Sequence, residues 1–232
     1  MALSGLIYSN AALARWVQTQ ANPLQNLNLS SSTEHKLDTA LRLLRGGGVV
    51  AVPTDTLYGL AADAFNPDAI ERVFGIKERP DGLALPVLLA DPGQLEMVAA
   101  QVSPQVRQIA EAYWPGPLTM IVKRASGLPP RLTAGHPTVA VRVPDHQVPR
   151  ELARKLGRPI TGTSANISGA ADPQSLEELR RQVGDRVDLV VEDGPSPAGT
   201  ASTIVDVSGN ELKLVRDGAV PFEEIAALFN SQ

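Results

Sequence analysis

The sequence predicts one α/β domain in which a twisted, mixed open sheet is flanked by helices. Segments with helical periodicity alternate along the chain with short apolar runs, and the connections between them are too irregular for a plain doubly wound sheet. The 232 residues are enough to bury a single sizeable core. We therefore expect a single domain with a short extension at its N-terminal end.

The first helix and the first strand are expected on either side of a run of three glycines. Apolar residues recur at helical spacing from Leu37 to Leu44, and the glycines at 46–48 end that pattern. The run 49–52 is apolar throughout, as in a strand covered on both faces, and Pro53 ends it. The residues after Pro53 are therefore expected to form a loop at a strand end.

Three more helices have recognisable starts. Asn66-Pro67 and Ser103-Pro104 each combine an N-cap residue with proline at the first helical position, and Ser175 with Glu178 has the spacing of a capping box. A turn is expected at 114–117. Further strands are expected at 87–89, 118–123, 138–143, around 160, and at 189–192, 202–207 and 212–215.

The composition is that of an ordinary globular protein. Hydrophobic residues make up 43% and charged residues 20%, without an apolar run of membrane-spanning length, so we expect a soluble protein with no membrane contact. Cysteine is absent, which excludes disulfides and thiolate zinc sites and favours a cytoplasmic location. Residues 1–32 lack sustained periodicity and are interpreted as an N-terminal extension to a domain over 33–232.

Two polar segments at the ends of predicted elements could hold a ligand. Thr54 and Thr56 flank Asp55 after the first strand, and such a group can bind an amino acid or a ribose by hydrogen bonds, or simply cap a turn. Lys77 and Arg79 at a helix exit could grip phosphate oxygens, or could be solvated residues favoured by the helix dipole. The spacing leaves both alternatives open.

A third segment and two arginines point to an anionic ligand. The small residues of 161–166 could form a phosphate cradle, although the Walker and dinucleotide glycine patterns are absent. Ser164 lacks the Gly-x-Ser-x-Gly elbow of hydrolases. Arg142 and Arg216 each emerge at or near the end of an apolar strand, which indicates an anionic partner, although Arg142 could also pair with an acid at a sheet edge.

No resident metal is expected. None of the three histidines has metal-ligand spacing relative to another. A magnesium ion that enters with ATP needs only one or two protein oxygens, which Asp55, Asp63 or Asp193 could supply, and the sequence selects none of them.

Seven short motifs occur in order between residues 53 and 218. They are Pro-Thr-Asp-Thr-Leu-Tyr-Gly-Leu at 53–60, Lys-x-Arg-Pro at 77–80, Trp-Pro-Gly-Pro-Leu-Thr at 114–119, Thr-Val-Ala-Val-Arg at 138–142, Thr-Ser-Ala-Asn at 163–166, Ser-Thr-Ile-Val-Asp at 202–206 and Val-Arg-Asp-Gly at 215–218. Each motif alone is unspecific, but in this order they closely resemble the YrdC/Sua5 family of threonylcarbamoyl-AMP synthases. The resemblance implies a YrdC-like catalytic domain over 33–232, of the short form without an additional C-terminal domain.

The resemblance implies a nucleotidyltransferase reaction. L-threonine, bicarbonate and ATP, with Mg²⁺, would give threonylcarbamoyl-AMP and pyrophosphate. Proteins of a threonylcarbamoyl-transferase complex would then pass the threonylcarbamoyl group to the adenosine beside the anticodon of tRNA. The protein could also contact the tRNA directly.

The resemblance also implies individual roles, with Lys77, Arg79 and Arg142 as the catalytic residues. Threonine is expected to be bound by Thr56, Arg142, Gly162 and Ser202, with Arg142 at its carboxylate. ATP is expected to be bound by Lys77, Arg79, Thr138, Ser164, Asn166, Asp172 and Arg216, where Asp172 differs in type from the residue in relatives.

Two positions depart from the family pattern. Leu85 stands where relatives usually have Asn or Lys before Pro-Leu, and Ala90 stands where many have a histidine near the threonine. Either change could weaken a substrate contact, or another side chain could compensate for it.

Two alternatives belong to other classes of function. An RNA-binding module of the same fold would have no chemistry, but the net charge of −4 and an aromatic content of 4% argue against recognition by base stacking. The second alternative is a carbamoyl-transfer domain. The proteins that contain such a domain are much larger and carry cysteine-rich zinc fingers.

Overall fold

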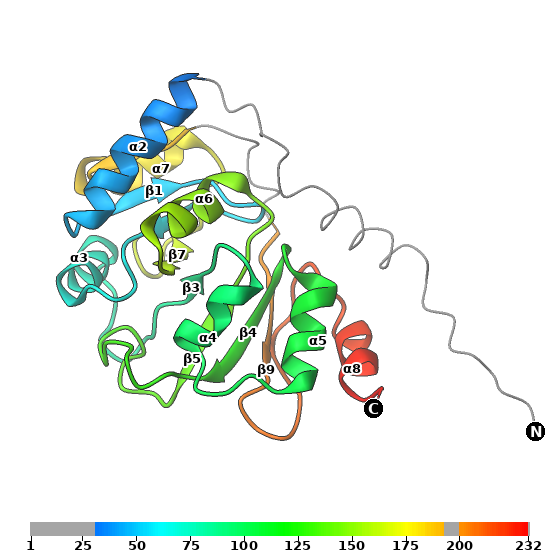
Figure 1. The fold of residues 1–232 in the computed structure, drawn as a ribbon. Helices are drawn as coiled ribbons and strands as arrows, with labels where there is room; N and C mark the ends of the chain where they lie inside the picture. The colour runs from blue at the N-terminus through cyan, green and yellow to red at the C-terminus, as the bar shows by residue number, and fades with distance from the viewer. Residues whose placement is uncertain (1–30, 193–199, 232) are drawn as a thin grey trace, which may run out of the picture.

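The computed structural model describes residues 31–192 and 200–231, and Figure 1 shows their arrangement. The predicted mixed α/β fold with flanking helices is confirmed, and its strands divide between two open sheets. The predicted extension at 1–32 lies outside the described residues, except that Ser31 and Ser32 begin the first described helix. The proposed domain boundary at residue 33 stays a prediction.

The described residues form the following elements. The helices are α2 (Ser31–Arg45), α3 (Pro67–Lys77), α4 (Leu95–Val98), α5 (Pro104–Tyr113), α6 (Gln147–Leu156), α7 (Leu176–Val183) and α8 (Phe222–Phe229). The strands are β1 (Val50–Val52), β2 (Gly59–Ala61), β3 (Val87–Leu88), β4 (Leu118–Lys123), β5 (Thr138–Arg142), β6 (Ile160–Thr161), β7 (Thr163–Ser164), β8 (Leu189–Val190), β9 (Thr203–Asp206) and β10 (Lys213–Arg216).

Both sheets are mixed. The four-stranded sheet has the order β7-β2-β1-β8, in which β1 is antiparallel to β2 and parallel to β8. The six-stranded sheet has the order β10-β9-β4-β5-β3-β6, in which β4 is antiparallel to β5 and parallel to β9. All three residues of β1 are buried, as the continuous apolar run predicts.

The three predicted helix starts are confirmed by hydrogen bonds. The side chain of Asn66 accepts from the first turn of α3, and the hydroxyl of Ser103 accepts from the first turn of α5. The Ser175 hydroxyl accepts from the Glu178 amide, and the Glu178 carboxylate accepts from the amide of Gln174, one residue before the N-cap.

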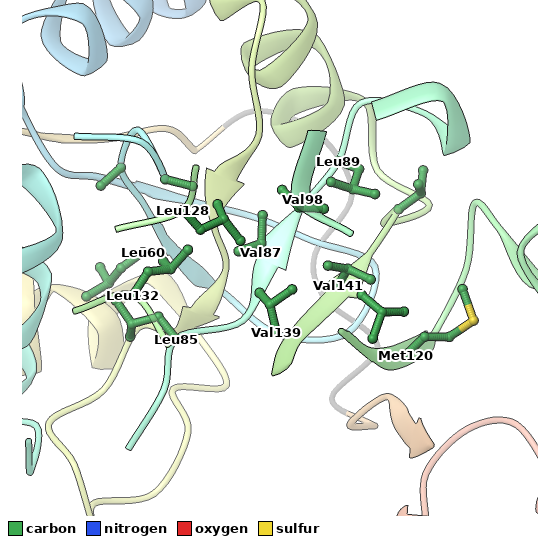
Figure 2. Close-up of a cluster of buried hydrophobic side chains, with 14 of the residues drawn as sticks. Leu60, Leu85, Val87, Leu89, Val98, Met120, Leu128, Leu132, Val139 and Val141 are labelled. Carbon is green, nitrogen blue, oxygen red and sulfur yellow. The ribbon is translucent and has the colours of Figure 1, made fainter. Parts of the chain in front are cut away.

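Two apolar clusters cover the sheets. In the larger one, Met120, Val141 and Val205 of the six-stranded sheet pack with α5 and α8, which lie side by side (Figure 1). Figure 2 shows the part of this cluster around Val87 and Val139. In the smaller one, α2 and α6 pack together over β1.

Several elements are not predicted from the sequence. Helix α6 begins after His146, whose ring nitrogen accepts from the Val148 amide, and histidine is an unusual N-cap. Helix α8 follows Pro221 without a side-chain cap. Strands β2 and β7 are so short that their residues have no readable alternation. None of the helices in residues 31–192 and 200–231 is long and apolar enough to cross a membrane.

Candidate functional site

A cavity of about 350 Å³ lies where the chain passes from one sheet to the other. Gly162 stands between β6 of the six-stranded sheet and β7 of the four-stranded sheet, and its amide donates to the carbonyl of Pro86. Most of the predicted site residues line this cavity, although they come from distant parts of the sequence. They are Thr56, Arg79, Arg142, Gly162, Ser164, Asp172, Ser202 and Arg216.

The strand register explains this convergence. Leu88 of β3 pairs with Arg142 of β5, and Ile204 of β9 pairs with both Thr119 of β4 and Arg216 of β10. The antiparallel register of β4 and β5 places Thr119 opposite Arg142. Paired residues share a face of a sheet, so these five side chains form one row across it. The alternate residues face the larger apolar cluster.

Arg142 is buried at the floor of the cavity. Its Nε donates to the carbonyl of Gly116 at 2.8 Å, and its Nη1 donates to the hydroxyl of Thr56 at 2.7 Å. Its Nη2 is 2.6 Å from Oδ1 of Asp55, but the pair is not aligned as a hydrogen bond, and neither atom has a hydrogen-bond partner in the described part of the chain. Burial lowers the pKa of the guanidinium, and the Asp55 carboxylate opposes that shift. Arg142 is therefore rigidly held and keeps hydrogen-bonding capacity.

In the loop after β1, the turn-capping interpretation is confirmed for Thr54, and the ligand-binding role of Thr56 stays a prediction. The hydroxyl of Thr54 accepts from the amides of Thr56 and Leu57 and donates to the carbonyl of Leu57 at 2.6 Å, so it caps a turn. The hydroxyl of Thr56 is instead turned toward Arg142 and lines the cavity. The turn therefore places Thr56 at the cavity.

Lys77 lies behind the cavity wall rather than in it. Its side chain is 1% exposed, and its ammonium group donates to the carbonyls of Ser164 and Asn166 and to the side-chain oxygen of Asn166. Ser164 also donates to that oxygen, at 2.7 Å. Burial, with the nearby charge of Arg79, lowers the pKa of Lys77 to about 8, and Asp172 opposes the shift. Lys77 and Asn166 thus hold the segment that carries Ser164.

Arg79 fixes the loop that follows it. Its Nε donates to the carbonyl of Leu83 at 3.0 Å and its Nη2 to that of Ala84 at 2.7 Å. Burial lowers the pKa of its guanidinium. The atypical stretch after Pro80 is therefore anchored by Arg79 at the edge of the cavity.

Ser202 and Arg216 form the opposite wall. Arg216 donates to the carbonyl of Ser202 at 2.8 Å and to its hydroxyl at 3.1 Å, and that hydroxyl is 2.8 Å from the hydroxyl of Thr119. Burial lowers the pKa of Arg216, and Asp172 opposes the shift. Thr119 belongs to the Trp-Pro-Gly-Pro-Leu-Thr motif but is not among the predicted site residues. The signal for it is its position in β4, because the residues on either side of it are buried in the larger apolar cluster.

Three of the predicted site residues are not among those lining the cavity: Lys77, Asn166 and Thr138. Thr138 lies on the same face of β5 as Ala140 and Arg142, at the far end of the strand from Arg142. Its contact with a nucleotide stays a prediction.

The two departures from the family pattern fall in different places. Leu85 lines the cavity and is fully buried, with its amide bonded to the carbonyl of Leu132. Ala90 packs in the smaller apolar cluster, and its carbonyl accepts from Arg150. Only Leu85 therefore borders the space in which a ligand would lie.

The described residues contain no group of three or more His, Asp or Glu side chains that could hold a metal ion. Asp63, one of the carboxylates considered for magnesium, accepts from the Phe65 amide and lies 3.3 Å from Arg158 outside the cavity lining. Asp193 lies outside the described residues.

One buried arginine, two more accessible arginines and several hydroxyl groups at the junction of two mixed sheets define an α/β protein with a cavity suited to anionic ligands. The chain belongs to the Sua5/YciO/YrdC family, whose model, described as "Telomere recombination", matches residues 42–218. A relative named threonylcarbamoyl-AMP synthase from Pyrococcus abyssi is 35% identical over 192 residues, which are 83% of this chain and 56% of that protein. One of the same name from Bacillus subtilis is 37% identical over 199 residues, 85% of this chain and 58% of that protein.

A solved structure agrees with these matches. The crystal structure of P. abyssi Sua5 complexed with L-threonine has a TM-score of 0.81 and 34% identity, and the match covers 85% of this chain and 58% of that one. The chain thus spans a little over half the length of these relatives.

Proposed function

We propose that this protein is a threonylcarbamoyl-AMP synthase, a nucleotidyltransferase that converts L-threonine, bicarbonate and ATP into threonylcarbamoyl-AMP and pyrophosphate. The observation that carries the proposal is Arg142, a buried arginine held by Thr56 and Gly116 at the floor of the cavity. A guanidinium in this position is suited to a carboxylate. The relatives that carry this enzyme name, and the one crystallised with L-threonine, support the choice of substrate.

Threonine and the phosphates of ATP would lie against different walls of the cavity. Threonine would lie by Arg142 and Thr56, with Gly162 and Ser202 beside it. The phosphates would lie near Arg79, Ser164 and Arg216, and the segment held by Lys77 and Asn166 would border them. Thr138 would meet the nucleotide farther along β5.

The chemistry needs orientation and charge neutralisation more than a covalent nucleophile. The amine of threonine attacks bicarbonate and water leaves, which gives a carbamate. A carbamate oxygen then attacks the α-phosphorus of ATP and pyrophosphate leaves. Arg79 and Arg216 would neutralise charge on the phosphates, and Arg142 would hold the reacting threonine in place. Magnesium, carried in with ATP, would neutralise further charge.

The product is an activated intermediate, so a later step must use it. We propose that proteins of a threonylcarbamoyl-transferase complex pass its threonylcarbamoyl group to the tRNA adenosine beside the anticodon, and that the protein works in the cytoplasm. The absence of cysteine supports that location.

Product analysis tests the proposal. Purified protein is incubated with ATP, Mg²⁺, bicarbonate and L-threonine, and pyrophosphate and threonylcarbamoyl-AMP are measured by mass spectrometry. We expect both products to form together and to disappear when threonine or bicarbonate is omitted. Absence of the adenylate would contradict the proposal, and salt-sensitive RNA binding without binding of threonine or ATP would favour the RNA-binding alternative.

A further inference from the structure

Asp172 is the one residue with a carboxylate among the described residues that line the cavity. Three arginines line the same cavity: Arg79, Arg142 and Arg216. The other nearby acid, Asp55, is already within 2.6 Å of Arg142. Asp172 is therefore a negative charge in a cavity whose other charged lining groups favour anions.

The backbone on both sides of Asp172 is held in place. The carbonyl of Ala171 accepts from Gln182 of α7 at 3.0 Å, and the carbonyl of Asp172 itself accepts from Gln174 at 3.2 Å. The next residue, Pro173, is buried. The position of Asp172 beside the cavity therefore follows from a fixed segment and does not depend on a loose loop.

Among residues 31–192 and 200–231, no residue forms a hydrogen bond or an ion pair with the carboxylate of Asp172. Its negative charge nevertheless acts on two nearby cations, Lys77 and Arg216. Burial lowers the pKa of both groups, and Asp172 opposes the shift in each case. Its oxygens remain available for a ligand that is itself positively charged.

ATP alone is a poor fit to this arrangement, because its phosphates would meet the negative charge of Asp172. A magnesium ion removes the conflict, since Mg²⁺ commonly binds one or two carboxylates together with the phosphate oxygens of a nucleotide. On the basis of the proposed function, we infer that Asp172 is the protein ligand of the magnesium ion that accompanies ATP. Asp172 thereby makes nucleotide binding depend on the divalent cation.

Equilibrium binding of α,β-methylene-ATP, which cannot react at the α-phosphorus, tests the inference by calorimetry in excess MgCl₂ and in excess EDTA. The wild type should bind the analogue on the order of tenfold more weakly in EDTA, by the Coulomb repulsion of Asp172. The variant Asp172→Asn should bind it more tightly in EDTA than the wild type does and should lose most of the gain from Mg²⁺. Asp185→Asn removes the same charge from an exposed residue outside the cavity and should behave as the wild type.

The outcomes separate the two proposals. If Asp172→Asn keeps the wild-type response to Mg²⁺, the inference is wrong while the proposed function stands. If the wild type binds the analogue under neither condition, the proposed function fails together with the inference. Circular dichroism of both variants checks that a loss of binding is not a loss of fold.

Discussion

The ammonium group of Lys77 lies 2.8 Å from the backbone carbonyl of Asn166 and 3.0 Å from its side-chain oxygen. A third acceptor, the carbonyl of Ser164, uses the remaining donor of the lysine. All three acceptors belong to the segment that carries Ser164 into the cavity wall. In this arrangement, Lys77 positions that segment and does not line the cavity.

Replacing Lys77 with methionine should destabilise the protein and weaken ATP binding together. The variant Lys77→Met removes the ammonium group that three acceptors share in a buried site, and we expect the free energy of unfolding to fall by about 2 kcal/mol. Urea denaturation measures this change. Lys155→Met removes the same charge from an exposed residue of α6 and should change the free energy by less than about 0.5 kcal/mol. Equal unfolding midpoints for the two variants would contradict the positioning role.

The lowered pKa of Lys77 predicts a pH dependence of stability. The folded-state pKa of about 8 lies below the usual 10.5, so the unfolded chain binds the proton more tightly. The free-energy cost of burying the charge is fully present below pH 8 and is progressively relieved between about pH 8 and 10.5. The stability of the wild type relative to Lys77→Met should therefore rise between pH 7 and pH 10, by up to about 2–3 kcal/mol. Urea denaturation of both proteins at each pH measures it, and a flat or falling difference would show that the lysine is not so perturbed.

Arg142→Lys should reduce threonine binding because an ammonium group cannot replace the planar fork that reaches Gly116 and Thr56 at once. Loss of one or two charge-assisted hydrogen bonds should raise the Kd for threonine by about 10–100-fold. Calorimetric titration with L-threonine measures the effect. Arg150→Lys is the matched control, since Arg150 is a partly buried arginine that donates to the carbonyl of Ala90 outside the cavity. A similar loss in both variants would indicate a general structural effect.

The sequence predicts the fold best where local signals are strong. The N-caps of α3, α5 and α7 and the apolar run of β1 are set by nearby residues, and the structure has them all. Strand β2 and helix α6 depend on tertiary contacts, so a short segment of sequence does not reveal them.

The sequence predicts the candidate site mainly through the seven ordered motifs between residues 53 and 218. Arg142 and Arg216 could be suspected from chemistry alone, because an arginine beside an apolar strand is uncommon. The burial of Lys77 behind the cavity could not, since a lysine at a helix exit is usually solvated and only the folded segment 163–166 supplies its three acceptors. The row of cavity side chains across the six-stranded sheet, which includes Leu88, Arg142 and Arg216, depends on strand register, and register cannot be predicted from this sequence.

Gly162 and Leu88 provide a test of how tightly the cavity wall is packed. A Cβ atom at position 162 would lie 2.3 Å from Cγ of Leu88, so Gly162→Ala forces Leu88 or the β6–β7 crossing to move. We expect the free energy of unfolding to fall by about 1–3 kcal/mol. Because Leu88 itself lines the cavity next to Arg142, threonine binding should weaken as well.

A double-mutant cycle separates this clash from other effects of the methyl group. Leu88→Ala alone should destabilise the protein by leaving a void, but the added methyl of Gly162→Ala should cost much less in that background, with a coupling energy of about 1–2 kcal/mol. Gly75→Ala is the control, because a Cβ there, in the last turn of α3, meets nothing within 4 Å and should stabilise the helix by up to about 0.5–1 kcal/mol. Additive effects of the two cavity substitutions would mean that Leu88 does not confine position 162, and the requirement for glycine at the crossing would need another cause.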